Sequence, residues 1–216
     1  MEQEKLEYPQ KEGSIKTVKD TACLPYNDLA GGIAVKIRSI VNEKLDNRQK
    51  VKLLNEIVEN RGFVTVSENT EKETVTKMFE TVHTESEYND NLNGAKALNK
   101  NGYDVYILPR VSGIKCFDYI LAKDSKVYAA ELKTIYGENS LSNRLKTANE
   151  QSDRVVLNIV GNATSRYVAD EIKGFYLRNS HIKEIIVLKG GKPFYVDYDQ
   201  TKDKKFAKKF MDRWAR

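Results

Sequence analysis

The segment 116–136 (CFDYILAKDSKVYAAELKTIY) constrains the fold of this chain more than any other part of the sequence. It contains two apolar runs separated by Asp124-Ser125, a polar pair of the right length for a two-residue β-hairpin loop. Apolar side chains occupy both faces of each run, which is typical of strands that are covered on both sides. The sequence therefore predicts a hairpin at the centre of a sheet, buried between two layers.

The hairpin hypothesis also fixes which residues face one another. With the two-residue loop at its tip, the pairing places Asp118 opposite Glu131. Directly opposed residues lie on the same face with Cβ atoms about 4.5–5.5 Å apart. Lys133 is two residues beyond Glu131 and shares that face. Two carboxylates and an ammonium group are therefore expected to converge at one end of an otherwise apolar strand pair.

This convergence predicts a chemistry. Two neighbouring carboxylates repel each other, and their burial is costly unless a positive charge compensates it. A divalent cation held by Asp118 and Glu131 supplies that charge, and oxygen ligands suit Mg²⁺ or Mn²⁺. Such an ion polarises a phosphodiester and lowers the pKa of a bound water, while Lys133 orients the water and offsets charge on phosphorus. The competing interpretation is a partly exposed hairpin end with ordinary surface charges.

The rest of the C-terminal part alternates helical and strand patterns. The predicted elements are a helix at 85–101, a strand at 103–108, the hairpin at 116–136, a helix at 140–153, a strand at 154–160, a helix at 165–179, strands at 182–188 and 192–198, and a basic amphipathic helix at the C-terminus. The order α-β-β-β-α-β-α-β-β-α predicts an α/β fold with a mixed central sheet flanked by helices on both faces.

The N-terminal part has a different pattern. Residues 28–61 carry apolar side chains at three- and four-residue spacing, which predicts helix, and Gly62 offers a helix stop. The polar stretch 66–76 (VSENTEKETVT) is predicted to be a linker. The expected organisation is a mainly helical module at 1–80 followed by an α/β domain at 81–216.

Composition narrows the function classes. The chain has 216 residues and a formal charge of +5, and residues 87–216 carry 23 Lys and Arg against 16 Asp and Glu. This basic balance indicates a polyanionic partner, with a plain solvated surface as the alternative. Two cysteines in separate segments and two histidines argue against a disulfide framework or a zinc site. No apolar run approaches the length of a membrane span, so stable membrane insertion is not expected.

The residues of the hairpin also resemble a known family. Asp118, twelve intervening residues and then Glu131-Leu132-Lys133 resemble the D…(D/E)xK signature of the PD-(D/E)xK nuclease superfamily, which has a restriction-endonuclease-like fold. The proline that precedes the aspartate in the signature is absent, and Cys116-Phe117 stand there. The runs NLNGAKALNKNGYDVYILP, FDYILAKDSKVYAAELK, LKTANEQSDRVVLNI and IKEIIVLKGGKPFYV further resemble the C-terminal tRNase toxin domain of contact-dependent growth inhibition (CdiA) proteins, over roughly residues 85–200.

The resemblance implies metal-dependent cleavage of transfer RNA by the Asp118, Glu131 and Lys133 trio. Gln151 fits a glutamine often found near this site, and a solvated helix-end amide is an equally open interpretation.

Family members usually place a glutamate on the helix before the first strand. This chain has Asn91 and Asn93 there, so Glu87, one turn earlier, is the candidate for a further active-site residue.

The resemblance further implies a bacterial toxin that acts in the cytoplasm of a target cell, is delivered from another cell and is neutralised by a cognate immunity protein. Residues 1–80 would then be a translocation or attachment module. The sequence leaves open whether the chain is free-standing or part of a larger toxin.

Basic residues flank the predicted site and are candidates for phosphate contacts: Arg110, Lys115, Arg144, Lys146 and Arg154. For any one of them, an ordinary solvated side chain is the competing interpretation. Two alternatives remain for the whole protein. One is a DNA endonuclease of the same superfamily from a mobile element or phage, and the other is a non-catalytic nucleic-acid-binding or phage-associated module.

Overall fold

The computed structural model describes residues 23–60, 62–79, 85–109, 117–149, 151–178, 182–190 and 193–215. Within them the helices are α1 (Cys23–Asn42), α2 (Asn47–Asn60), α3 (Glu85–Asn99), α4 (Leu141–Asn149), α5 (Ser165–Arg178), α6 (Tyr198–Lys202) and α7 (Phe206–Trp214), with a 3₁₀ turn, η1, at Glu138–Ser140. The strands are β1 (Phe63–Asn69), β2 (Thr74–Phe79), β3 (Asp104–Ile107), β4 (Tyr119–Lys123), β5 (Lys126–Ile135), β6 (Arg154–Ile159), β7 (Glu184–Leu188) and β8 (Phe194–Val196).

The strands form one eight-stranded mixed sheet in which they lie side by side in chain order, from β1 to β8. The pairs β2–β3, β5–β6 and β6–β7 are parallel, and the other neighbours are antiparallel. This arrangement confirms the predicted α/β class, with a mixed sheet between helices.

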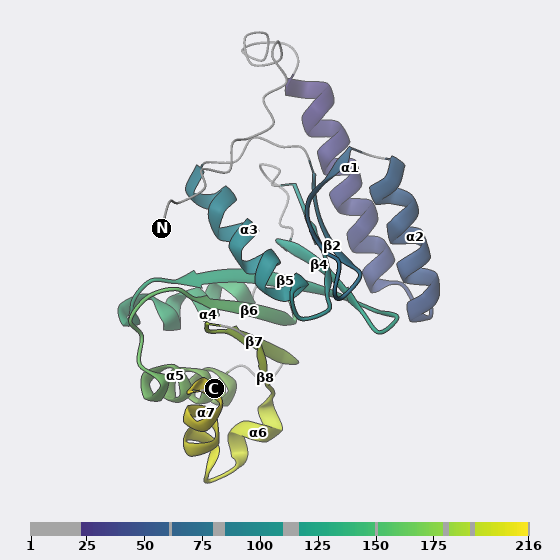
Figure 1. Cartoon of the computed structure of the whole chain (residues 1–216). Coiled ribbons are helices and arrows are strands. Elements are labelled where there is room, and N and C mark those ends of the chain that lie inside the picture. The colour runs from purple at the N-terminus through teal and green to yellow at the C-terminus, as the bar shows by residue number, and fades with distance from the viewer. Residues whose placement is uncertain are drawn as a thin grey trace.

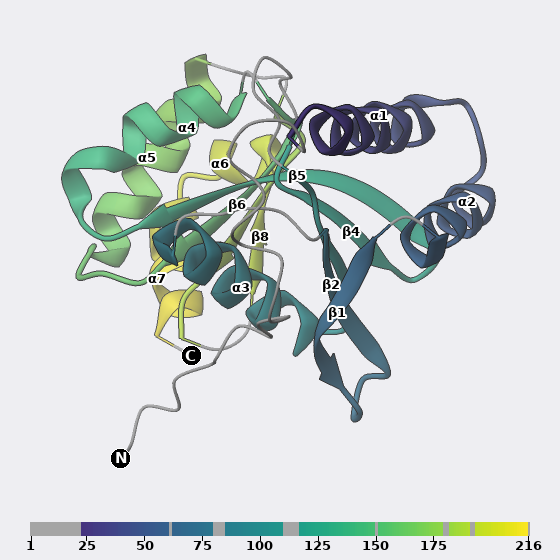
Figure 2. The ribbon, with the colours of Figure 1, turned by 90° about the horizontal axis from the view of Figure 1, so that it is seen from above.

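Helices cover both faces of the sheet (Figures 1 and 2). One face packs against α3 through a cluster that includes Leu98 and Leu121. The other face carries two separate groups of helices. There α1 and α2 cover β3, β4 and the first half of β5, whereas α4, α5 and α7 cover the end of β5 and strands β6 to β8.

The central hairpin has the predicted register. The β4–β5 ladder runs from the pair Tyr119 and Ala130 to the pair Lys123 and Lys126. Both loop residues have positive φ, 49° and 58°, as a type I′ turn requires. The prediction of facing residues is therefore confirmed over the whole of β4.

The helix after the hairpin ends earlier than predicted, at Asn149 rather than near residue 153. Local side-chain hydrogen bonds explain the early stop. The Ser152 hydroxyl donates to the carbonyl of Ala129 at 3.2 Å and accepts from the amide of Arg154 at 3.2 Å. A serine that bonds in this way competes with helix continuation and turns the chain into β6.

The linker prediction for residues 66–76 is wrong, because this stretch belongs to the β1–β2 hairpin. The stretch is polar since β1 is an edge strand of the sheet and the turn at its end is exposed. Burial increases in β2, where the Thr74 hydroxyl donates to the Asn99 carbonyl at 2.9 Å. The amide of Val75 donates to the Asp104 carboxylate at 2.9 Å.

The predicted helical region 28–61 is divided into α1 and α2. Asp46 and Gln49 form a reciprocal capping box at the start of α2, with side-chain-to-amide hydrogen bonds of 2.9 and 3.2 Å. Gly62 follows α2 with φ of 83°, in agreement with the predicted stop.

The two N-terminal helices pack on the same sheet as the C-terminal part. Ile37 of α1 and Leu54 of α2 are buried in one cluster with Ile120 of β4 and Ala129 of β5. The division of the chain at residue 80 stays a prediction. Within the described residues, no helix combines the length and the apolar character that a membrane crossing requires.

The backbones at the ends of β5 and β6 approach each other closely at Gly161. A substitution that adds a methyl group at Gly161 is therefore expected to destabilise the fold. The amides of Val160 and Gly161 both donate to the carbonyl of Ile135, at 3.0 and 3.1 Å. A Cβ at Gly161 would lie 1.7 Å from the Tyr136 carbonyl oxygen. We therefore expect Gly161→Ala to lower the free energy of unfolding by about 1–3 kcal/mol or more, measured by urea denaturation.

The matched control is Gly137→Ala. A Cβ at Gly137 meets nothing within 4 Å, and its backbone is extended, with φ of −164°. Its effect should stay within about 0.5 kcal/mol. Equal losses in the two variants would contradict the close approach at Gly161.

Candidate active site

The candidate site lies on the sheet face that carries the two helix groups, at the boundary between them. Side chains at alternate positions of β5 point to this face. Ala129 belongs to the cluster under α1 and α2, and Ile135 to the cluster under α4 and α5. Glu131 and Lys133 occupy the two positions between them. The apolar pattern of β5 thus gives way to charge where the two helix groups meet.

Asp118 directly precedes β4 and is 8% exposed. Its Oδ2 accepts a hydrogen bond from the amide of Leu132 at 2.9 Å. That bond fixes the carboxylate against β5, next to Glu131, whose pKa its charge raises. The structure therefore brings the two acidic groups together, as the hairpin pairing predicted.

Glu131 is the most deeply buried charged group of the cluster, with 1% exposure. Burial and, after it, the charge of Asp118 raise the pKa of this carboxyl to about 7, although the Lys133 ammonium acts in the opposite direction. Its Oε2 atom is buried and has no hydrogen-bond donor among the described residues. A buried carboxylate oxygen of this kind is costly unless a proton or a cation approaches it.

Lys133 joins the acidic pair to the segment after α4. Its Nζ forms a short, charge-assisted hydrogen bond with Oε1 of Glu131 and a long one, at 3.5 Å, with Oε1 of Gln151. Four of the predicted site residues thus form one cluster. Their catalytic roles stay predictions, because proximity alone does not establish them.

Glu87, the fifth predicted residue, lies half-buried in the first turns of α3. This helix covers the sheet face opposite to Glu131 and Lys133. It is tied to the hairpin by the Tyr119 hydroxyl, which donates to the Asn91 carbonyl at 2.6 Å. A role for Glu87 in the site remains a prediction.

The donors suit a small hard cation. Among the described residues, no group of three or more His, Cys, Asp and Glu side chains gathers in a way that could hold a metal ion. Mg²⁺, however, is usually bound through only one or two carboxylates together with waters and substrate phosphates. Asp118, Glu131 and the unsatisfied Oε2 atom therefore fit Mg²⁺ or Mn²⁺ by their chemistry, and cofactor binding remains to be tested.

Two cavities adjoin the cluster. The larger, of about 710 Å³, is lined by Arg38, Asn47, Phe117, Lys126, Val127, Tyr128, Ala129, Asn149, Gln151, Ser152, Asp153, Arg154 and Lys183. The smaller, of about 370 Å³, is lined by Lys133, Ser140, Asn143, Arg144 and Thr147. Gln151 belongs to the first cavity and Lys133 to the second, so their hydrogen bond lies between the two.

The predicted phosphate-contacting residues have different positions. Arg154 lines the larger cavity and Arg144 the smaller one. Lys146 is exposed on α4 and is not among the residues that line either cavity. Arg110 and Lys115 lie outside the described residues.

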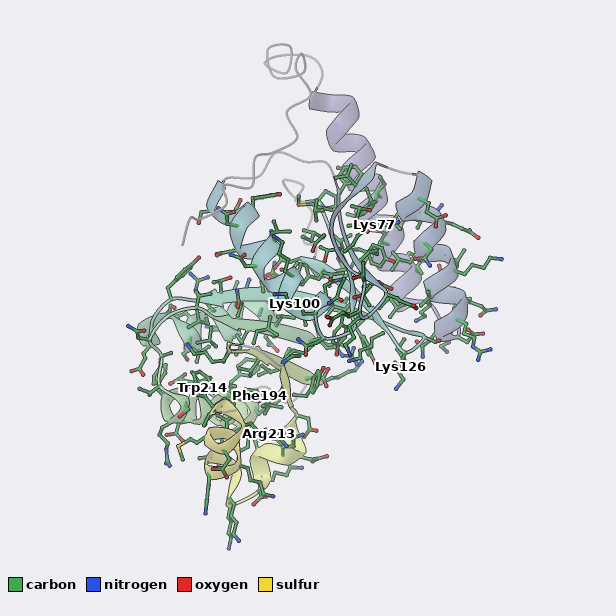
Figure 3. All side chains as sticks on the ribbon, viewed as in Figure 1. Lys77, Lys100, Lys126, Phe194, Arg213 and Trp214 are labelled. Atoms are coloured by element: carbon green, nitrogen blue, oxygen red, sulfur yellow. The ribbon has the colours of Figure 1, made fainter. Side chains whose placement is uncertain are left out.

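The sequence prediction missed several residues of the larger cavity, chiefly Arg38, Asn47, Lys126 and Lys183. They come from four separate segments of the chain, and no local pattern marks them. The basic character of Lys126 at the hairpin turn was the only available indication (Figure 3).

The raised pKa of Glu131 predicts a pH dependence of stability. Between pH 4.5, the ordinary value, and about 7, the folded protein retains a proton that the unfolded chain releases. The contribution of this group is therefore complete below pH 4.5 and is lost as the pH rises to 7. Relative to Glu131→Gln, the wild-type free energy of unfolding should fall by about 3 kcal/mol across this window.

Urea denaturation of both proteins at several pH values measures the difference directly. Groups distant from Glu131 are common to both proteins, so their titrations cancel in the difference. Parallel pH profiles for wild type and variant would show that Glu131 titrates at its ordinary pKa.

Comparison with known proteins gives one weak structural likeness. No protein-family model matches the sequence, and no curated protein matches it. A chain of the CdiA-CT/CdiI toxin and immunity complex from Burkholderia pseudomallei aligns with a TM-score of 0.36 and 16% sequence identity, over 55% of this chain and 92% of that chain. At this TM-score the likeness does not establish a common fold.

Proposed function

We propose that this protein is a metal-dependent endoribonuclease with transfer RNA as its substrate. The observation that carries the proposal is the buried Glu131 carboxylate, which lies beside Asp118 and has an oxygen without a donor among the described residues. Lys133 lies on the same face and binds the same carboxylate. These residue types are suited to phosphodiester hydrolysis at a divalent cation.

In the proposed site, Asp118 and Glu131 would hold Mg²⁺ or Mn²⁺, and the bound ion would supply Lewis-acid chemistry towards a phosphodiester. Lys133 carries three N–H donors, and the described hydrogen bonds to Glu131 and Gln151 use two of them. The third is available for the attacking water or for a phosphoryl oxygen that gains charge. Gln151 accepts the second of these hydrogen bonds and so helps to position the ammonium group of Lys133.

A purely structural role explains the cluster less well. A buried ion pair needs one carboxylate and one ammonium, and Glu131 with Lys133 already supplies both. Asp118 adds a second negative charge, which destabilises the pair by repulsion. Residues that cost stability in this way are typical of functional sites.

The substrate and the biological setting rest on the sequence resemblance. The restriction-endonuclease-like classification, the choice of transfer RNA, delivery into a target bacterial cell and neutralisation by an immunity protein all belong to this proposal. A DNA endonuclease would use the same residues, so the assay must compare the two substrates.

The purified protein is expected to degrade transfer RNA with Mg²⁺ or Mn²⁺, and EDTA should stop the reaction. Lys133→Met retains the aliphatic length but removes the ammonium group, and Glu131→Gln removes the anionic ligand. Each should lower the cleavage rate by about 10²-fold or more. Denaturing gel electrophoresis measures the rate on transfer RNA, duplex DNA and single-stranded DNA in parallel.

Lys77→Met is the matched control, because Lys77 is also a half-buried strand lysine and lies on β2 (Figure 3). It should cleave at the wild-type rate. Normal cleavage by Lys133→Met or Glu131→Gln would refute the assignment of the site. Cleavage of DNA but not of RNA would show that the substrate is DNA, and the assignment of the site residues would still hold.

A further inference from the structure

The larger cavity connects the N-terminal helices with the candidate active site. Arg38 of α1 and Asn47 at the start of α2 line one side of it, and Gln151 lines another. Gln151 also accepts the hydrogen bond from Lys133. A ligand in this cavity would therefore contact α1, α2 and Gln151, the residue that links the cavity to Lys133.

The lining of the cavity favours an anionic ligand. Four lining side chains are basic, namely Arg38, Lys126, Arg154 and Lys183, and only Asp153 is acidic. Phe117, Val127 and Ala129, by contrast, contribute buried apolar surface. A cavity with this excess of cationic side chains suits a polyanion such as a nucleic-acid strand.

Arg154 lies on the face of β6 opposite to Glu131, because Glu131 pairs with Val155 and successive residues of a strand alternate between faces. Its guanidinium lies over the Tyr128 ring, 4.3 Å from the centroid, which fixes its orientation. Its ion pairs with Asp153 and Glu184 both measure 3.6 Å, too long for hydrogen bonds. Its Nε is buried and has no hydrogen-bond partner among the described residues. Arg154 therefore lines the cavity without being directed at the candidate cluster.

The segment that carries Gln151 and Arg154 is held in place from both ends. The Lys183 amide donates to the Asp153 carbonyl at 2.8 Å, and the Lys183 ammonium pairs with the Asp153 carboxylate at 2.5 Å. Ser152 is bonded to the Ala129 carbonyl of β5. This side of the cavity is therefore preorganised, and binding does not need to order it.

From these contacts we infer that the larger cavity is the binding groove for an unpaired nucleic-acid strand and that the N-terminal helices form one of its walls through Arg38. This inference rests on the proposed nuclease function and assigns a substrate-binding role to α1. An unpaired strand offers phosphates to the basic side chains of the lining and exposed base faces to its aromatic residues, Phe117 and Tyr128. A duplex keeps its base faces stacked and would leave the apolar surface without a partner.

Binding measured without cleavage tests the groove separately from the chemistry. Fluorescence anisotropy of a labelled single-stranded RNA oligonucleotide, in EDTA and over a series of salt concentrations, gives Kd for each variant of the full chain. Arg38→Ala should raise Kd about three- to tenfold and reduce the slope of log Kd against log salt by about 0.7. Arg38→Lys should restore most of the slope, because it keeps the charge.

Lys36→Ala is the matched control. Lys36 is exposed on the same helix, two residues from Arg38, and does not line the cavity. It should bind like wild type. Lys126 lies at the hairpin tip, remote in sequence from α1, and Lys126→Ala should weaken binding as Arg38→Ala does. This second variant shows whether the loss in Arg38→Ala comes from the cavity or from a local disturbance of helix α1.

The outcomes separate the two proposals. Equal affinities of the Arg38→Ala and Lys36→Ala proteins, or tighter binding of duplex than of single strand, would overturn the groove even if the wild type cleaves RNA. Weakened binding by Arg38→Ala and Lys126→Ala would support the groove even if no nuclease activity is found. In that case the proposed function, and not the groove, would be rejected.

Discussion

The backbone register between β4 and β5 determines the position of every group in the candidate site. A type I′ turn of two residues sets this register, and its twist matches that of the flanking strands. A shift by one residue would move Asp118 from the face of Glu131 to the face covered by α3. Burial on both sides of the hairpin makes such a shift costly, because apolar and charged side chains would exchange environments. The geometry of the cluster is thus a consequence of strand pairing.

The cluster holds two carboxylates and one ammonium, so it retains a negative charge in a buried place. Burial and the neighbouring Asp118 make the ionised form of Glu131 unfavourable, so its pKa is raised. At low pH a proton neutralises this carboxylate. A divalent cation bound to the carboxylate would neutralise it in the same way and would compete with the proton. Lys133 compensates only part of the negative charge: it binds Oε1 of Glu131, whereas Oε2 has no donor among the described residues.

Features with a local physical cause were predictable from the sequence. The hairpin follows from two apolar runs separated by a polar pair of turn residues, and the stop at Gly62 follows from its left-handed conformation. The β1–β2 hairpin was missed because an edge strand can be as polar as a linker. Arg38 and Lys183 could not be assigned to a common cavity, since only tertiary packing brings α1 and the start of β7 to the same end of β5.

The position of the groove follows from the width of the sheet. Eight strands are too wide for one helix pair, so two groups of helices share one face, and each buries its own apolar cluster. Side chains of β5 at their boundary belong to neither cluster, so this boundary is where a central strand carries the charged residues Glu131 and Lys133. The helices α1 and α2 therefore have two roles. They bury the first half of the hairpin, and they form the wall of the groove that faces the candidate site. A chain without them would expose Ile120 and Ala129 and lose one side of the groove in the same step.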